Sequence, residues 1–198
     1  ECIYTRPADS PGKAVHLAHR MGFPVALKID SPDILHKSDC GGVRLNLQSA
    51  QQLRNAFVKI MDDTRQCYPN ARISGAVVSP MAAPGLELLI GMNRDPQFGP
   101  VIMFGLGGVT VELFRDVSMR LLPLSREDAS AMLGEIKSAP LLKGYRGRAG
   151  IDENAVVDSL LRLASIAEEH PEIVEIDLNP VIAYSDGVLV VDARIIRA

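Results

Sequence analysis

The sequence predicts an α+β fold made of two lobes. Two observations favour this class over a doubly wound parallel sheet: the predicted hairpins are mixed with helices, and strands do not strictly alternate with helices. A third observation is a cluster of Pro and Gly at residues 79–85, which marks a soft boundary. We therefore expect lobes over residues 1–78 and 79–198, with a ligand cleft between them, because clefts between lobes are frequent binding places.

Capping residues and alternation define the elements of the first lobe. Ser10 can cap a helix whose first turn holds Pro11, and Gly22 is a typical stop. The alternation of side chains over residues 23–29 predicts a strand, with Lys28 on one face and aliphatic side chains on the other. The other elements expected here are a polar loop over 30–42, a strand over 43–47, a helix from Ser49 to about Cys67 and a strand over 73–79.

The second lobe shows the same kinds of signal. Ser125 and Asp128 resemble a capping box, which predicts a helix from there to about residue 138. A turn over 185–187 predicts a hairpin near the end of the chain. The remaining elements expected are strands over 86–92, 100–104 and 117–122, a helix over 154–169, and hairpin strands over 173–183 and 188–195.

Composition limits the classes of function. The chain has 198 residues, a formal net charge of −3 and 47% hydrophobic residues, which is typical of a globular protein without a basic surface for nonspecific nucleic-acid binding. No apolar run reaches the roughly 18 residues of a membrane helix. Three cysteines without a CxxC pair predict neither a disulfide framework nor a zinc site, and favour a reducing, cytoplasmic setting. Because the chain starts at Glu1 without a methionine, we expect a piece of a longer protein or missing first residues.

Lys28 and the loop that follows it could bind a phosphate chain. Phosphates need cations and backbone N–H donors, and Gly41 and Gly42 permit close approach because they lack a Cβ atom. The loop is not a Walker A motif, since no Gly-Lys-Ser/Thr follows the glycines. The alternative is that Lys28 lies at the surface and the glycines only turn the chain. His36 lies in the same loop, where a neutral imidazole could attack a phosphoryl group or could be ordinary surface.

The C-terminal hairpin could hold a magnesium ion. Alternation places Asp177 and Asn179 on one face of their strand. If the turn consists of residues 186–187, Asn179 faces Arg194, and Asp192 lies diagonal to Asn179 on the same face. Oxygen ligands from adjacent strands suit magnesium. The alternative is a solvated polar face, and a shifted register would change the geometry.

Together these motifs resemble the ATP-grasp part of the NDP-forming acyl-CoA synthetases, a family similar to succinyl-CoA synthetase and its beta subunit. The resemblance covers nearly the whole chain, and its motifs are long and in order. They are PVALK at 24–28, SPDILHKSD at 31–39, DPQFGP at 95–100, FGLGG at 104–108 and DLNP at 177–180.

The resemblance implies a site for ATP or ADP with magnesium. The nucleotide contacts that it implies are Lys28 at the phosphates, Gly41 and Gly42 closing the loop over them, Ser79, Pro80 and Met81 beside the adenine, and Glu87 near the ribose. Asn179 and Asp192 would hold the magnesium ion. His36 would match the family's second phosphohistidine, and Asp177 would match the acidic residue that steadies a phosphohistidine.

The implied reaction is reversible: acyl-CoA, phosphate and ADP give the free acid, CoA and ATP. Its partners would be the CoA-binding and phosphohistidine-bearing domains, or the alpha subunit, of the same enzyme. One alternative is a regulatory ATP-grasp module of a fused protein acetyltransferase, which senses nucleotide or acyl-CoA. Another is an assembly subunit without a ligand. The presence of His36, Asn179 and Asp192 favours the enzyme, because a degenerate module would be expected to lose them.

Overall fold

The chain folds into two compact units in a computed structural model that describes residues 1–34, 37–108, 116–145, 147 and 149–198. The N-terminal unit is Ile3–Met81, and the C-terminal unit is Glu1–Cys2 with Ala82–Ala198. The expected boundary after residue 78 falls inside strand β4 (Gly75–Pro80), whose pairing with its neighbour continues to Pro80. Because a paired strand belongs to one sheet, the boundary lies after Met81 instead.

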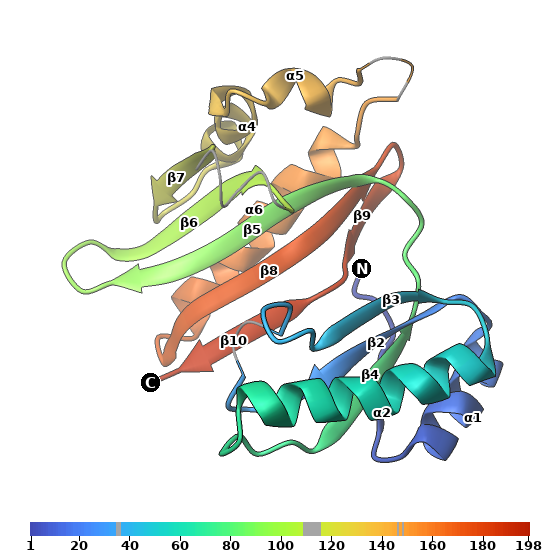
Figure 1. Cartoon of the computed structure of the whole chain (residues 1–198). Coiled ribbons are helices and arrows are strands. Elements are labelled where there is room, and N and C mark those ends of the chain that lie inside the picture. The colour runs from blue at the N-terminus through green and yellow to red at the C-terminus, as the bar shows by residue number, and fades with distance from the viewer. Residues whose placement is uncertain (35–36, 109–115, 146, 148) are drawn as a thin grey trace. The chain divides into compact units, whose positions relative to one another are not determined.

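The N-terminal unit is one antiparallel sheet with two helices on one face (Figure 1). Its strand order is β1-β4-β2-β3, where β1 is Arg6–Ala8, β2 is Val25–Asp30 and β3 is Val43–Leu47. The helices are α1 (Pro11–Met21) and α2 (Ala50–Cys67). The core between helices and sheet consists of Ala14, Val15 and Ala18 of α1, Leu53, Phe57 and Ile60 of α2, and Val25, Leu27, Ile29, Ala76 and Val78 of the strands, together with Ala8.

Local signals set the ends of both helices. The Ser10 hydroxyl accepts the Lys13 amide at 3.4 Å, and Gly22 ends α1 with a φ of 87°. The Ser49 hydroxyl accepts the Gln52 amide at 3.3 Å and starts α2. Each cap satisfies a helix-end N–H group that has no partner inside the helix. Both helices therefore confirm the prediction from sequence.

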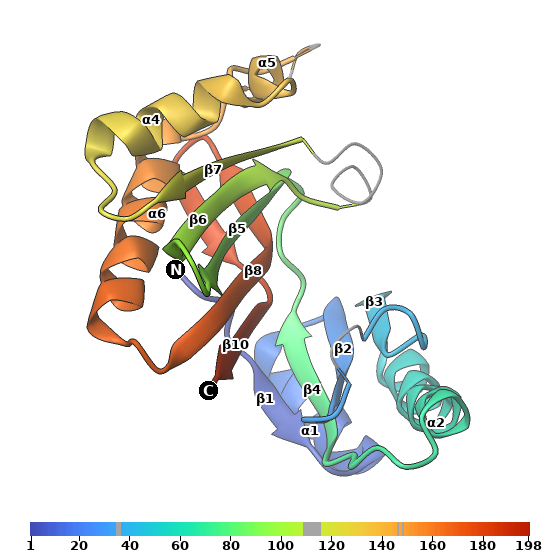
Figure 2. The same ribbon diagram turned by 90° about the vertical axis from the view of Figure 1, so that its left-hand side faces the viewer.

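The C-terminal unit is a larger antiparallel sheet, and Figure 2 shows its long helix α6 lying along one face. The strand order is β10-β8-β5-β6-β7, and β9 also pairs with β8. The strands are β5 (Leu86–Asp95), β6 (Gly99–Leu106), β7 (Val117–Leu121), β8 (Ile173–Tyr184), β9 (Gly187–Val190) and β10 (Ala193–Arg197). The helices are α4 (Arg126–Glu135), α5 (Ala139–Leu142) and α6 (Glu153–Glu169).

The core of this unit lies between the sheet and the helices. Fully buried side chains of β5 and β6 meet those of α4 and α6, as shown by Ile90, Phe104, Met132 and Leu160. The capping box of Ser125 and Asp128 starts α4 as expected. Among the described residues, no helix is both long and apolar enough to cross a membrane.

Several details differ from the sequence prediction. Helix α4 ends at Glu135 because Ile136 is extended, whereas a helix to about residue 138 was expected. The expected strand over 188–195 is divided into β9 and β10. Pro180 lies across from the break and has no N–H to donate, which interrupts the ladder there. The short strand β1 was not expected, because three residues carry no periodic pattern.

Candidate functional site

The register of the C-terminal hairpin differs by one residue at the turn from the expected one. Tyr184 pairs with Gly187, so the turn consists of residues 185–186 and not 186–187. Arg194 therefore pairs with Asp177, and the expected pairing of Asn179 with Arg194 is wrong. Asn179 lies opposite Asp192 instead, and its amide donates to the Asp192 carbonyl at 3.2 Å.

This correction brings the two expected metal ligands closer together. Directly opposite residues in an antiparallel pair point to the same face, whereas diagonal ones lie several ångströms further apart. Asp177 precedes Asn179 by two residues and shares its face. The other face of β8 is apolar, since Ile176 is buried in the core and Leu178 packs against it. The expected division of β8 into a polar and an apolar face is confirmed.

The donor set of this pair fits a hard cation. An amide oxygen from Asn179 and a carboxylate from Asp192 are the kinds of ligand that magnesium prefers. In the part of the chain that the structure describes, no three His, Cys, Asp or Glu side chains group together as a metal cage. Two protein oxygens leave most of an octahedral shell to waters and phosphate oxygens, as is usual for magnesium that is bound with a nucleotide.

Arg194 is a residue of this face that the sequence analysis did not select. Its guanidinium forms an ion pair with Glu175, and its register places it opposite Asp177. Its Nε atom is buried and has no hydrogen-bond partner among the described residues. The cation thus lies beside two carboxylates of β8 and offsets their mutual repulsion. The sequence analysis placed Arg194 opposite Asn179, and only the correct turn register places it opposite Asp177.

Lys28 lies in the centre of the N-terminal unit's sheet. It pairs with Val43 of β3 and with Val77 of β4. Its neighbours Leu27 and Ile29 belong to the core, so Lys28 points to the face without helices, as predicted. Only 9% of the residue is exposed, which is uncommon for a lysine.

Gly41 and Gly42 do not present free amides. The Gly41 amide donates to the Ser38 carbonyl at 3.0 Å, and the Gly42 amide donates to the Lys37 carbonyl at 2.7 Å. Both donors are thus used within the loop in this conformation, and the expectation that these glycines close over phosphates stays a prediction. Their role here is to let the loop turn tightly on itself.

The segment expected beside the adenine ends β4. Ser79 is buried and pairs with Ala26. Pro80 has no N–H, and the Met81 amide donates to the Pro24 carbonyl at 3.2 Å. Pro80 and Met81 therefore offer no backbone N–H to a ligand, so any hydrogen bond that they make to an adenine uses their carbonyl oxygens.

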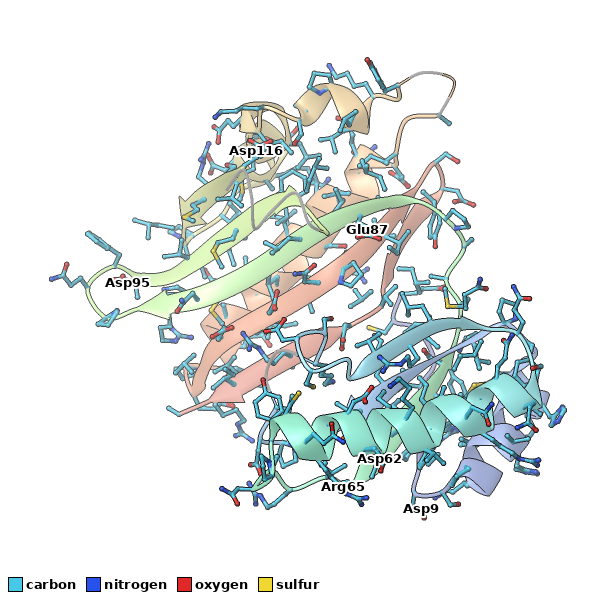
Figure 3. All side chains as sticks on the ribbon, viewed as in Figure 1. Asp9, Asp62, Arg65, Glu87, Asp95 and Asp116 are labelled. Atoms are coloured by element: carbon cyan, nitrogen blue, oxygen red, sulfur yellow. The ribbon has the colours of Figure 1, made fainter. Side chains whose placement is uncertain are left out.

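Glu87 lies near the start of β5, as Figure 3 shows. The Gly107 amide donates to its carbonyl at 2.7 Å. A Cβ atom at Gly108 would lie 2.8 Å from the Glu87 carboxylate, and Gly108 has a φ of 69°. Because Gly107 and Gly108 have no side chain, this segment can pack closely against the exposed Glu87 near the start of β5.

The predicted residues form two groups, one in each unit. Lys28, Gly41, Gly42 and the segment 79–81 belong to the N-terminal unit. Glu87, Asp177, Asn179 and Asp192 belong to the C-terminal unit. His36 lies outside the described residues.

Comparison with known proteins defines the class of the fold. The family model described as "ATP-grasp domain" matches residues 1–196. The chain is 52% identical to acetyl-coenzyme A synthetase 1 of Ca. Korarchaeum cryptofilum, in a structure with coenzyme A and Ca-AMPCP. That similarity has a TM-score of 0.95 and covers 100% of this chain and 86% of the other. The predicted α+β ATP-grasp fold is confirmed.

Two curated relatives identify the family more specifically. The chain is 46% identical to the beta subunit of acetate–CoA ligase [ADP-forming] I from Pyrococcus furiosus, over 96% of this chain and 82% of that one. It is also 46% identical to acetate–CoA ligase [ADP-forming] I from Archaeoglobus fulgidus, of which it spans only 27%. The chain therefore belongs to the ATP-grasp domain family, as the ATP-grasp part of the ADP-forming acetate–CoA ligases. The resemblance inferred from sequence is confirmed at this level.

Proposed function

We propose that this chain binds a magnesium complex of ATP or ADP and moves a phosphoryl group between the nucleotide and His36 within an ADP-forming acyl-CoA synthetase. The observation that carries the proposal is the direct opposition of Asn179 and Asp192 on the polar face of the C-terminal sheet. The Korarchaeum protein supports it, because one of its structures contains Mg-AMPPCP with a phosphohistidine segment pointing towards the nucleotide-binding site.

Each residue has a role that follows from its chemistry. Lys28 neutralises charge on the nucleotide phosphates, and Asn179 and Asp192 hold the metal. Bound magnesium supplies further neutralisation of phosphate charge. By the family resemblance, Asp177 serves as the acidic residue that steadies a phosphohistidine. In the direction of ATP synthesis, the imidazole nitrogen forms a bond to phosphorus as the acyl phosphate bond breaks. The nitrogen–phosphorus bond then breaks as an ADP oxygen attacks.

The remaining partners belong to the proposal as well. The two units correspond to two ATP-grasp lobes, with Lys28 in one and the Asn179–Asp192 pair in the other. Coenzyme A and the acyl group bind on other domains or subunits, since the P. furiosus relative is a beta subunit and the A. fulgidus relative is far longer than this chain. A cytoplasmic location is consistent with Cys2, Cys40 and Cys67, which are all free thiols.

Titration calorimetry of the purified protein with Mg-ADP tests the metal pair. Asn179→Ala and Asp192→Ala are each expected to weaken binding by at least about 100-fold, because loss of an outer-sphere partner alone costs about 10–100-fold in metal affinity. Asp186→Asn is the matched control, since this carboxylate lies in the turn of the same hairpin. The control should bind as the wild type does, and EDTA should abolish the magnesium-dependent part. Unchanged affinity in both alanine variants would overturn the proposal.

A further inference from the structure

The polar face of the C-terminal hairpin gathers several carboxylates around the metal pair, Asn179 and Asp192. Glu175, Asp177 and Asn179 occupy every second position of β8, so their side chains share one face. Asp192 lies opposite Asn179 and adds a third carboxylate to this face. Carboxylates gathered in this way attract a divalent cation whether or not a nucleotide accompanies it. Selectivity for a metal–nucleotide complex over the free ion therefore requires a compensating positive charge.

Arg194 supplies a positive charge next to the metal pair. It pairs with Asp177 across the hairpin, and its guanidinium forms an ion pair with Glu175. The Arg194–Asp177 pair and the metal pair are neighbours in one register, so both lie on the same face. Arg194 follows Asp192 by two residues, a spacing of roughly 7 Å along a strand.

The other strand partners of the two β8 carboxylates, Glu175 and Asp177, are uncharged. They are Gly91 and Asn93 of β5 and Ile196 of β10. Among the described residues paired directly with these carboxylates, Arg194 is thus the one cation. Its side chain is 27% exposed and that of Glu175 is 30% exposed, so water screens these charges less than it would at the surface.

The stability of the hairpin does not by itself explain Arg194. Its Nε group is buried and has no hydrogen-bond partner among the described residues, which costs stability because the bond to water is lost. The half-buried ion pair with Glu175 has to offset the cost of taking both charges partly out of water. A side chain kept at such a cost is better explained by the effect of its charge on a ligand.

We propose that Arg194 is a specificity-determining residue, which makes the metal pair prefer a metal–nucleotide complex over the free metal ion. The inference rests on the proposed function, because it requires that Asn179 and Asp192 hold the metal of a bound nucleotide. The guanidinium repels the doubly positive free ion. It attracts Mg-ADP and Mg-ATP, whose phosphates leave one and two net negative charges. One side chain thus acts in opposite directions on two ligands that share the same ion.

Four variants separate this electrostatic role from a structural one. Arg194→Gln removes the charge and keeps a side chain that can donate to Glu175, whereas Arg194→Lys keeps the charge. The double variant Arg194→Gln with Glu175→Gln restores the local balance of charge. Arg197→Gln is the matched control, because it removes one positive charge from the end of β10 that is distant from Asp192. Arg197 pairs there with Glu172 at 3.5 Å.

Binding of free Mn²⁺, followed by loss of the paramagnetic resonance signal of the aqueous ion, measures the metal pair without nucleotide. Mn²⁺ takes the same kinds of oxygen ligand as magnesium. A unit charge at this spacing, in surroundings between water and protein, changes the affinity for a divalent ion about 10-fold. We expect Arg194→Gln to bind Mn²⁺ about 10-fold more tightly than the wild type.

The same variant should bind nucleotide complexes more weakly. Because the effect scales with the charge of the ligand, calorimetry should show a loss of about 10-fold for Mg-ATP and about 3-fold for Mg-ADP. Arg194→Lys, the double variant and Arg197→Gln should all lie close to the wild type. Salt at about 1 M should reduce every shift, since it screens charges beyond a few ångströms. Adding Asp192→Ala to Arg194→Gln should abolish the gain in Mn²⁺ affinity.

The outcomes separate this inference from the proposed function. If the wild type shows no magnesium-dependent binding of ADP or ATP, the proposed function fails and the selectivity role fails with it. If the wild type binds nucleotide and Arg194→Gln binds Mn²⁺ no more tightly, only the selectivity role is overturned. Weaker binding of both Mn²⁺ and Mg-ATP would also overturn it, because Arg194 would then only support the hairpin. A gain in Mn²⁺ affinity that survives Asp192→Ala would place the ion elsewhere and count against the role as well.

Discussion

Substitution of Gly42 by alanine tests whether this glycine serves the loop itself or a bound phosphate. A Cβ atom at Gly42 would lie 2.6 Å from the Lys37 carbonyl oxygen and 2.9 Å from Ile29 Cγ2. Both distances are well below ordinary contact, so Lys37 must move by several tenths of an ångström. That movement strains the 2.7 Å hydrogen bond between the Gly42 amide and the same carbonyl.

The size of the effect follows from these two contributions. Forcing a methyl group into a packed position costs about 1–3 kcal/mol, and a weakened buried hydrogen bond costs about 1 kcal/mol more. For a chain of this size, a loss of about 2–4 kcal/mol lowers the unfolding temperature by roughly 4–16 °C. Calorimetric melting of the protein without nucleotide measures this directly.

Gly12→Ala provides the control, since Gly12 lies in α1 with nothing within 4 Å of the added Cβ. It should raise stability by about 0.5 kcal/mol, because alanine loses less backbone entropy than glycine in a helix. The reasoning is refuted if Gly42→Ala melts at the wild-type temperature. It is refuted most clearly if that variant also binds Mg-ADP weakly, because Gly42 would then serve the nucleotide.

Two further predictions concern other parts of the chain. Arg94 donates to the carbonyls of Ala167, His170 and Ile173 at 2.8, 3.3 and 3.1 Å, so Arg94→Ala should destabilise the C-terminal end of α6 by about 1–3 kcal/mol in urea unfolding, without changing Mg-ADP affinity. The hydrogen bonds from Arg72 lower the pKa of Asp33 from 3.8 to about 2, so ionised Asp33 favours the folded state above its unfolded pKa. That contribution should be lost as the pH falls from about 4 towards 2. The urea concentration at the unfolding midpoint should therefore depend less on pH in Asp33→Asn than in the wild type over this range. An equal pH dependence in the two proteins would contradict this assignment.

Signals within a few residues predicted the fold well. Ser10, Ser49 and Ser125 each cap a helix as expected, because a cap depends only on the residues next to it. Alternation also placed Lys28 and Asp177 on faces opposite their buried neighbours. These features follow from the geometry of single helices and strands.

Features that depend on pairing were harder to predict. The position of Asn179 relative to Asp192 depends on which two residues form a turn several positions away, and a change of one residue alters every partner. The use of the Gly41 and Gly42 amides within their own loop was missed, because residue identity does not show which carbonyl takes an N–H. Arg194 was placed opposite Asn179 for the same reason, since its true partner, Asp177, follows only from the correct register.

The interruption at Pro180 has a consequence for how this hairpin can change in evolution. The pairs Val181–Val190 and Leu178–Ala193 on either side of the gap keep one common register. The Asn179–Asp192 position therefore lies in a short gap between two paired segments of the hairpin that share one register. Because both flanking pairs keep this register without the side chain of Asn179, a lineage could exchange that amide for a carboxylate while the hairpin still folds.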